Sequence, residues 1–249
     1  MIGNEKTEYS LEGLKQLIDG YQAVSFDIFD TLVMRTVYFN HDVFRIVGEK
    51  YKDEIPNFFD VRVKAERELS QTRYPYMEEI YDYIAKESGI DDSLKTEIMN
   101  YEIAVERQVI VVRKEMVEVF NYCKETGKKT YIVSDMYMHQ KDLEDIINNL
   151  GIVGYDKIFV SSEYDTSKPQ RLFEEYKNEI IVENYLHIGD SFACDIAPSK
   201  KLGIDSFRLK TSAEIYESVG GNPSNDFSER KKQAEIIADK YNSPFTITE

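Results

Sequence analysis

Hydrophobic positions follow two alternating periods along much of the chain. Four short apolar segments, rich in β-branched and aromatic residues, have the pattern of buried strands: residues 23–26, 130–133, 157–160 and 185–188. Residues 141–150 show helical spacing, and a second helix begins near Pro169. A further helical stretch ends near residue 203, before a candidate fifth strand at residues 205–209. This alternation predicts an α/β fold, a Rossmann-like parallel sheet flanked by helices.

Residues 36–114 interrupt the alternation between the first and second strands. Apolar residues recur there at helical spacing, in blocks that begin near Val43, Val61, Ile80 and Leu94. These helices either pack on the edge of the sheet or cover the ends of its strands. We favour a cap over the strand ends, because the insertion follows closely after the first strand. The predicted domains are a core of residues 1–35 and 115–212, a helical cap of residues 36–114, and a helical, polar tail of residues 213–249.

Composition narrows the classes of function. The 249-residue chain is 42% hydrophobic, enough for a substantial core, and its 31 basic and 46 acidic residues give a net charge of −15. This charge repels nucleic acid and anionic membranes, but a small phosphorylated substrate is compatible with it, because a bound metal ion reverses the potential locally. No apolar run has the length of a membrane span, and residues 1–10 lack a signal-peptide core. We therefore expect a cytoplasmic protein.

Polar residues that can take part in catalysis or ligand binding follow the first three predicted strands. A carboxylate at a strand end, such as Asp27, suits a nucleophile or metal ligand, and equally a local turn. At Ser134 and Asp135, a hydroxyl and the following backbone amides can hold an anionic oxygen, or Ser134 caps a helix. Lys168 stands near a helix start, where its charge opposes the helix dipole, so a purely structural role fits it less well.

The fourth strand leads directly into Gly189 and Asp190, with Asp195 five positions later. The glycine permits a tight turn, and the two carboxylates can face one hard cation, directly or through water. Two unpaired acids after an apolar strand are costly unless a cation or hydrogen-bond donors compensate them. The sequence therefore predicts an acidic, cation-binding edge of the sheet.

In combination and in order, these four segments resemble the four motifs of the haloacid dehalogenase superfamily, over nearly the whole chain up to about Leu209. The resemblance implies that Asp27 is an aspartyl nucleophile and that Ser134 binds the phosphoryl group, with Asp135 beside it. It also implies that Lys168 neutralises the nucleophile and the transferred group. The insertion between the first two motifs resembles the helical cap of these enzymes.

The same resemblance implies an Mg²⁺ site. Its ligands are the carboxylates of Asp27 and Asp190 and the backbone carbonyl of Phe29, with Asp195 as a second, outer acid. A narrower likeness rests on residues 26–32, 134–137 and 187–190. It is to a bacterial subgroup of hydrolases encoded beside, or fused to, glycosyltransferases of surface polysaccharide synthesis, which implies a glycosyltransferase as a partner.

One position departs from the phosphatase pattern. Phosphatases of the superfamily usually carry an acid/base Asp two residues after the nucleophile, and here that residue is Phe29. Haloacid dehalogenases also have an aromatic residue there, but they generally lack the glycine and aspartate of the fourth motif. Asp30 replaces the acid if the turn directs it inward, or it only favours the turn; Asp135 is a weaker substitute. In the cap, Tyr74 and Tyr76 are candidates for substrate contact.

The function that this pattern favours is an Mg²⁺-dependent phosphohydrolase that acts on a small phosphorylated metabolite through an aspartyl-phosphate intermediate. Two alternatives stay open. The first is dehalogenase-type hydrolysis at the same Asp27, which needs neither metal nor protonation of the leaving group. The second is a catalytically weak module that binds a phosphorylated ligand or a glycosyltransferase. The sequence pattern leaves the substrate and the oligomeric state open.

Overall fold

The computed structural model describes residues 8–71 and 73–245. Its strands are β1 (Ala23–Phe26), β2 (Val33–Arg35), β3 (Ile110–Val112), β4 (Lys129–Ser134), β5 (Lys157–Val160), β6 (Tyr185–Gly189) and β7 (Asp205–Arg208). Its α-helices are α1 (Leu11–Asp19), α2 (Asp42–Lys50), α3 (Phe58–Leu69), α4 (Met77–Ser88), α5 (Asp92–Val109), α6 (Lys114–Glu125), α7 (Gln140–Asn149), α8 (Phe173–Glu179), α9 (Ala197–Lys201), α10 (Ser212–Ser218) and α11 (Phe227–Lys240), and two π-helical turns are η1 (Lys168–Leu172) and η2 (Phe192–Ile196). None of these helices has the length and apolarity needed to cross a membrane.

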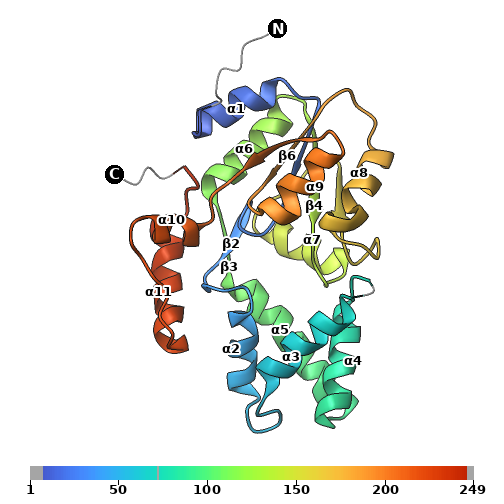
Figure 1. Ribbon diagram of the computed structural model, residues 1–249, viewed down its shortest axis with the longest axis vertical. Coiled ribbons are helices and arrows are strands. Elements are labelled where there is room, and N and C mark those ends of the chain that lie inside the picture. Colours follow the sequence, from blue (N-terminus) through green and yellow to red (C-terminus); the bar gives the residue numbers. More distant parts are fainter. Residues whose placement is uncertain (1–7, 72, 246–249) are drawn as a thin grey trace.

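Five parallel strands form the central sheet, in the order β5-β4-β1-β6-β7 (Figure 1). Successive side chains of a strand point to opposite faces. Phe26 and Ile132 therefore belong to one apolar core, and Tyr131 and Val133 to another. Because helices cover both faces, β1, β4, β5 and β6 are mainly buried on both sides, which explains their apolar runs, whereas the edge strand β7 is partly exposed. The sheet confirms the predicted α/β fold, and its parallel order brings the carboxyl ends of β1, β4 and β6 to one edge.

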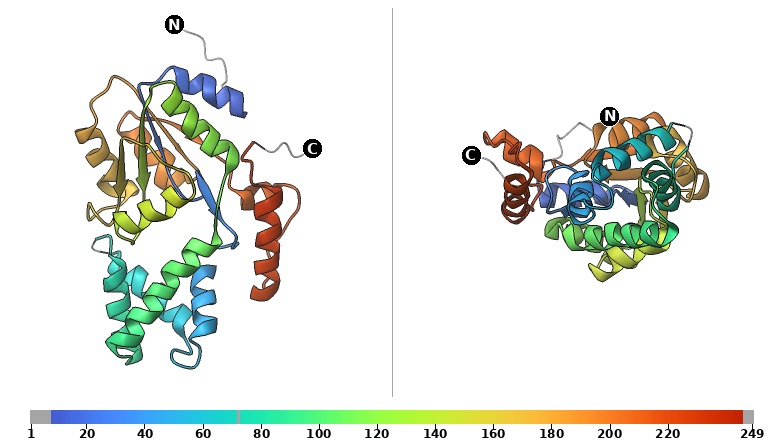
Figure 2. Two further views of the ribbon diagram at one scale, coloured as in Figure 1. Left: turned by 180° about the vertical axis from the view of Figure 1, so that it is seen from behind. Right: turned by 90° about the horizontal axis from the view of Figure 1, so that it is seen from below.

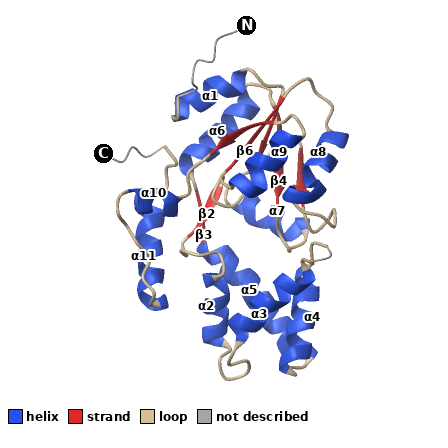
Figure 3. Cartoon of the chain, viewed as in Figure 1, coloured by secondary structure: helices blue, strands red, loops and turns tan. Residues whose placement is uncertain are grey.

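Helices α2 to α5 form a separate layer beyond this edge of the sheet (Figures 2 and 3). They connect to it through β2 and β3, which pair antiparallel with Arg35 opposite Ile110. This two-stranded linker was not predicted from the sequence. Residues 110–112 lie within the range assigned to the cap, but three consecutive β-branched residues favour a strand over a continued helix. The chain therefore joins the helical layer to the core twice, once through each of these two antiparallel strands.

The C-terminal segment packs against both the linker and α2. Arg230 on α11 donates two hydrogen bonds to the Asp42 carboxylate on α2, at 2.9 and 2.7 Å, and both side chains are nearly buried. The Asn242 amide nitrogen donates to the Val112 carbonyl at 2.8 Å, and the Asn242 side-chain oxygen accepts from the Lys114 backbone at 3.1 Å. The region expected to be a polar tail is thus a brace that joins the linker to the cap helices.

Candidate active site

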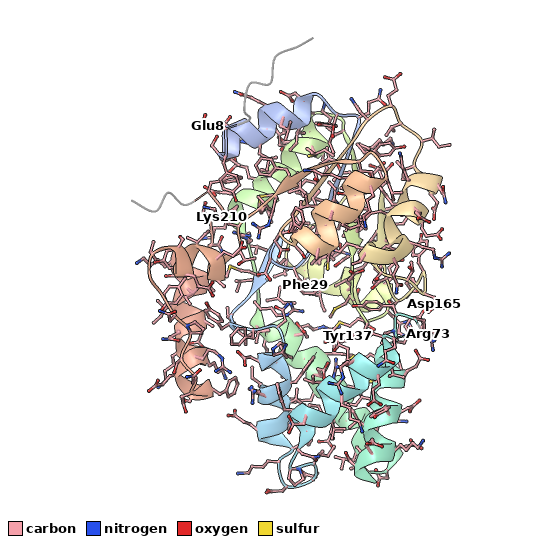
Figure 4. The ribbon with its side chains drawn as sticks, viewed as in Figure 1. Glu8, Phe29, Arg73, Tyr137, Asp165 and Lys210 are labelled. Atoms are coloured by element: carbon pink, nitrogen blue, oxygen red, sulfur yellow. The ribbon has the colours of Figure 1, made fainter. Side chains whose placement is uncertain are left out.

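A cavity of about 380 Å³ lies where the carboxyl ends of the strands face the cap helices. Phe29 and Tyr137 lie in this space between the two layers (Figure 4). Of the residues that the sequence predicts for the site, those that line the cavity are Asp27, Phe29, Asp30, Asp135, Lys168, Asp190 and Asp195. The fold therefore brings together side chains from four strand ends. From the cap, Tyr74 lines the cavity, whereas Tyr76 packs on His139 with ring centroids 4.6 Å apart.

Asp27 directly follows β1 and is 6% exposed. Its backbone N–H donates to the Ile188 carbonyl of β6 at 2.9 Å, which continues the parallel ladder and fixes the start of the loop. Lys168 Nζ donates to Asp27 Oδ1 at 2.7 Å. Burial raises the pKa of Asp27 to about 7, although the Lys168 ammonium acts in the opposite direction. Lys168 engages only one of the two Asp27 carboxylate oxygens, and a backbone hydrogen bond from Ile28 also lowers the pKa of this carboxyl.

Lys168, the first residue of η1, places its ammonium between two carboxylates. Its Nζ lies 2.7 Å from Asp27 Oδ1 and 2.5 Å from Asp195 Oδ1. Burial opposes its charge, but Asp195 and Asp27 outweigh burial and hold the pKa of Lys168 well above its usual range. The Lys168 backbone N–H donates to Asp135 Oδ1 at 2.9 Å. Asp135 therefore orients the turn that carries this lysine.

Asp195 is fully buried, and protein groups occupy both of its oxygens. Oδ1 accepts from Lys168 and lies 3.2 Å from His187 Nε2, while Oδ2 accepts from the Ser191 backbone at 2.9 Å. Burial would raise the pKa of Asp195, but Lys168 and His187 outweigh it and hold that pKa well below its usual range. A Cβ on Gly189 would lie 2.4 Å from the Asp195 carboxyl carbon, so only glycine permits this approach.

Asp190 has the opposite environment. Within the described residues its carboxylate has no hydrogen bond or ion pair, although its backbone carbonyl accepts from Arg208 at 2.8 Å. Burial first, and then repulsion by Asp27, Asp30 and Asp195, raise the pKa of Asp190 to about 8. Carboxylate oxygens of Asp27, Asp190 and Asp195 lie within 4.8 Å of one another. The unpaired carboxylate of Asp190 beside that of Asp27 offers hard oxygen ligands of the kind that a divalent cation neutralises.

Two predicted residues have less direct placements. The Ser134 hydroxyl is buried without a hydrogen-bond partner in the described residues, and Ser134 is absent from the lining of the cavity. Asp30 has a left-handed backbone with φ of 55°, and its carbonyl accepts from Arg113 at 2.5 Å. Burial raises the pKa of the Asp30 carboxyl, while Arg35 and Arg113 oppose that shift. The position of Asp30 at the cavity is compatible with an acid role and with a turn role.

One cationic group in the cavity was not predicted from the sequence. Arg35 at the end of β2 donates from Nε and Nη2 to the two Glu106 oxygens, at 2.9 and 3.1 Å. Its guanidinium carbon lies 3.9 Å from the centre of the Phe29 ring. The pair joins residues 71 positions apart, on β2 and α5, and no local pattern indicates such a contact. The only sequence signal is a charge at the end of the apolar run of residues 32–34.

Comparison with known proteins identifies the family. Residues 21–203 match the model of the haloacid dehalogenase-like hydrolases, which covers most of the chain. The chain belongs to this family. A curated member, haloacid dehalogenase-like hydrolase domain-containing protein 3 of Mus musculus, is 32% identical over 101 residues, which are 39% of this chain and 39% of that protein. The match thus spans about two fifths of that relative.

Solved structures of other haloacid dehalogenase-like proteins share the fold. The 2-haloacid dehalogenase of Pseudomonas syringae is similar with a TM-score of 0.54 and 13% identity, over 82% of this chain and 90% of that one. A candidate HAD-hydrolase of Bacillus subtilis, YfnB, solved bound to magnesium, has a TM-score of 0.51 and 17% identity, over 76% and 86%. At these identities the likeness shows a shared fold and does not extend to the chemistry of the site.

Proposed function

We propose that this haloacid dehalogenase-like hydrolase is an Mg²⁺-dependent phosphohydrolase of a small phosphorylated metabolite, with Asp27 as the covalent nucleophile. The observation that carries the proposal is the contrast between two carboxylates at one strand edge. Asp27 is paired with Lys168 through one of its oxygens, while the Asp190 carboxylate beside it has no hydrogen bond or ion pair in the described residues. This arrangement combines a nucleophile with oxygen ligands for a cation.

The chain's own residues support in-line phosphoryl transfer. The Asp27 oxygen that Lys168 does not engage attacks phosphorus, and the bond from phosphorus to the leaving oxygen breaks with the electron pair on that oxygen. The Lys168 ammonium, held on Asp27 and Asp195, stays beside the group in transfer and offsets its charge. The Ser134 hydroxyl, buried without a partner, is a donor that a phosphoryl oxygen would satisfy if the β4 end adjusts toward the cavity. Water then attacks the aspartyl phosphate, which releases phosphate and restores Asp27.

The residues fit a magnesium ion. Asp27 and Asp190 would hold it through carboxylate oxygens, with the Phe29 backbone carbonyl as the further ligand that the family resemblance implies. When bound, Mg²⁺ supplies charge neutralisation between the phosphoryl oxygens and the acidic edge of the sheet. Asp195 fits an outer position, because both its oxygens already accept hydrogen bonds from the protein.

The proposed activity is tested by measuring phosphate release from acetyl phosphate and p-nitrophenyl phosphate. We expect turnover with Mg²⁺, loss of turnover in EDTA, and recovery when Mg²⁺ is added in excess. Chloride release from 2-chloropropionate that persists in EDTA would instead establish a dehalogenase. Absence of both activities, together with binding of a glycosyltransferase or a phosphorylated ligand, would establish a binding module. A cytoplasmic location belongs to the same proposal.

The proposed metal site predicts a pH-dependent stabilisation by Mg²⁺. Without metal, the pKa of Asp27 is raised to about 7 and that of Asp190 to about 8. The folded protein therefore keeps protons on these carboxyls at pH values where the unfolded chain has already lost them. Stability of the metal-free protein should therefore fall as the pH rises from about 4 to about 8. Because protons compete with Mg²⁺ for these oxygens, the increase in Tm on adding Mg²⁺ should be larger at pH 8.5 than at pH 6. At an Mg²⁺ concentration of about 100 times Kd, binding should raise the free energy of unfolding by about 2.7 kcal/mol.

Asp190→Asn separates the two effects. This variant should raise the Tm in EDTA at pH 8.5, because one of the repelling charges is gone, and should lose most of the Mg²⁺-dependent increase. Asp145→Asn is the matched control, since Asp145 is an exposed carboxylate on α7, and it should behave as the wild type. An unchanged Mg²⁺ effect in Asp190→Asn would place the metal elsewhere.

A further inference from the structure

Arg35 is held rigidly beside the position where related phosphatases carry an acid. Its guanidinium carbon lies 3.9 Å from the centre of the Phe29 ring, and Glu106 accepts hydrogen bonds from its Nε and Nη2. The two side chains are 9% and 2% exposed. Phe29 stands two residues after the nucleophile Asp27, so the stacked guanidinium occupies the neighbourhood of the reacting group.

One part of Arg35 has no protein partner. Nη1 makes no hydrogen bond within the described residues, although Arg35 lines the cavity. A free Nη1 on a fixed guanidinium is a preorganised donor, because its side-chain entropy is already lost in the contacts with Phe29 and Glu106. An arginine of this kind stays charged and donates hydrogen bonds without giving up a proton.

Two cationic side chains of the described residues line the cavity, and they differ in how far the protein itself engages them. Among the described residues that line it, Lys168 and Arg35 are the two with permanently cationic side chains, and the ammonium of Lys168 is engaged by Asp27 and Asp195. Asp30, Glu66 and Glu106 add acidic groups to the same cavity, and Glu106 is the partner of Arg35. Nη1 of Arg35 is therefore the cationic donor of this cavity that the described residues leave without a hydrogen bond.

We propose that Arg35 binds the leaving group of the phosphorylated substrate, an inference that rests on the proposed function. The Asp27 oxygen forms a bond to phosphorus, the bond from phosphorus to the leaving oxygen breaks, and that oxygen keeps the electron pair. Nη1–H of Arg35 donates a hydrogen bond to the departing anion, which takes a proton from water only after release. The substrate class is an acyl phosphate or a phosphoanhydride, whose leaving group departs as a stable anion.

The test separates the two half-reactions in single-turnover experiments. A series of aryl phosphates with increasing leaving-group pKa measures formation of the phosphoenzyme, and acetyl phosphate loads it for measurement of its hydrolysis. In the double variant Arg35→Met/Glu106→Gln, which leaves no unpaired buried carboxylate, formation should slow by about 10²- to 10³-fold for the poorest leaving groups. The slope of log rate against leaving-group pKa should steepen. Hydrolysis of the phosphoenzyme should keep its rate, since the leaving group is absent.

Two further variants complete the design. Arg35→Lys keeps a charge and should recover part of the rate with poor leaving groups. Arg45→Met is the matched control, because Arg45 also stacks on a phenylalanine, with its guanidinium carbon 3.7 Å from the centre of the Phe59 ring, but lies outside this cavity. It should leave both half-reactions unchanged.

Three results would overturn the inference. An equal slowing of both half-reactions would show that Arg35 only supports the fold. An unchanged slope in Arg35→Lys and the double variant would assign the leaving group to another residue, and loss of the same poor substrates in Asp30→Asn would identify that acid. A wild-type protein that forms no phosphoenzyme with any of these compounds would reject the proposed function itself, which is a distinct result from an altered slope.

Discussion

Replacing Asp27 with asparagine is expected to lower phosphate release by at least about 10⁴-fold, the scale on which removal of a covalent nucleophile acts. The amide keeps the shape of the side chain but cannot attack phosphorus. The variant should remain folded, because a neutral amide avoids the cost of burying the charged carboxylate, the same cost that raises the pKa of Asp27. Lys168 also keeps its contact with Asp195. Phosphate release and thermal unfolding, measured on the same preparation, distinguish loss of chemistry from loss of structure.

A direct probe of the covalent step accompanies this variant. Beryllium fluoride should raise the Tm of the wild type in the presence of Mg²⁺ and leave Asp27→Asn unaffected, because the mimic forms on a carboxylate oxygen. Borohydride reduction of the phosphoenzyme, followed by peptide mass analysis, should modify Asp27. Turnover by Asp27→Asn within tenfold of the wild type would show that another group attacks the substrate, and a modified Asp30 would identify it.

Replacing Lys168 with methionine should affect both activity and stability. The substitution leaves Asp27 and the fully buried Asp195 without the ammonium that lies between them, at 2.7 and 2.5 Å. Removing one partner of a buried ion pair typically costs about 3–5 kcal/mol. Phosphate release should fall by about 10²- to 10³-fold, because a preorganised cation at the transferred group is lost.

The pH dependence of stability in Lys168→Met distinguishes a loss of charge from a loss of packing. In the wild type, the depressed pKa of Asp195 contributes stability above about pH 4, which is lost as the pH falls through its folded pKa. Without Lys168, the buried carboxyls should take up protons more readily, so the variant should gain more stability than the metal-free wild type as the pH falls from 8 to 5. Lys177→Met on α8 is the matched control: Lys177 lies outside the cavity and bonds a backbone carbonyl, so its pH profile should follow the wild type. A pH-independent deficit in Lys168→Met would mean lost packing instead of lost charge.

The sequence predicted the frame of the site for a physical reason. Strands β1, β4, β5 and β6 are buried on both faces, so their apolar runs are unambiguous, and parallel strands place their carboxyl ends at one edge. Asp27 and Asp190 directly follow β1 and β6, which are neighbours in the sheet, so these two residues had to lie close together. The same argument brings η1, and with it Lys168, to this edge from β5.

The contacts within the site required the structure. A spacing of five residues after Asp190 is compatible with a cation ligand and with the observed use of Asp195, which holds Lys168 and His187. The spacing alone does not reveal which partner each carboxylate chooses. The Arg35 pair with Glu106 is likewise invisible locally, because its partners come from β2 and α5 and meet only when the linker forms.

The brace formed by α11 sets a mechanical condition on access to the cavity. Arg230 ties α2 near the cavity wall, while Asn242 is bonded to the linker strand at Val112 and to the start of α6 at Lys114. A swing of the cap about its linker must therefore carry α11 with it or shear the contact at Asp42. A displacement of α11 would therefore be transmitted through Arg230 and Asp42 to α2, of which Phe44 lines the cavity.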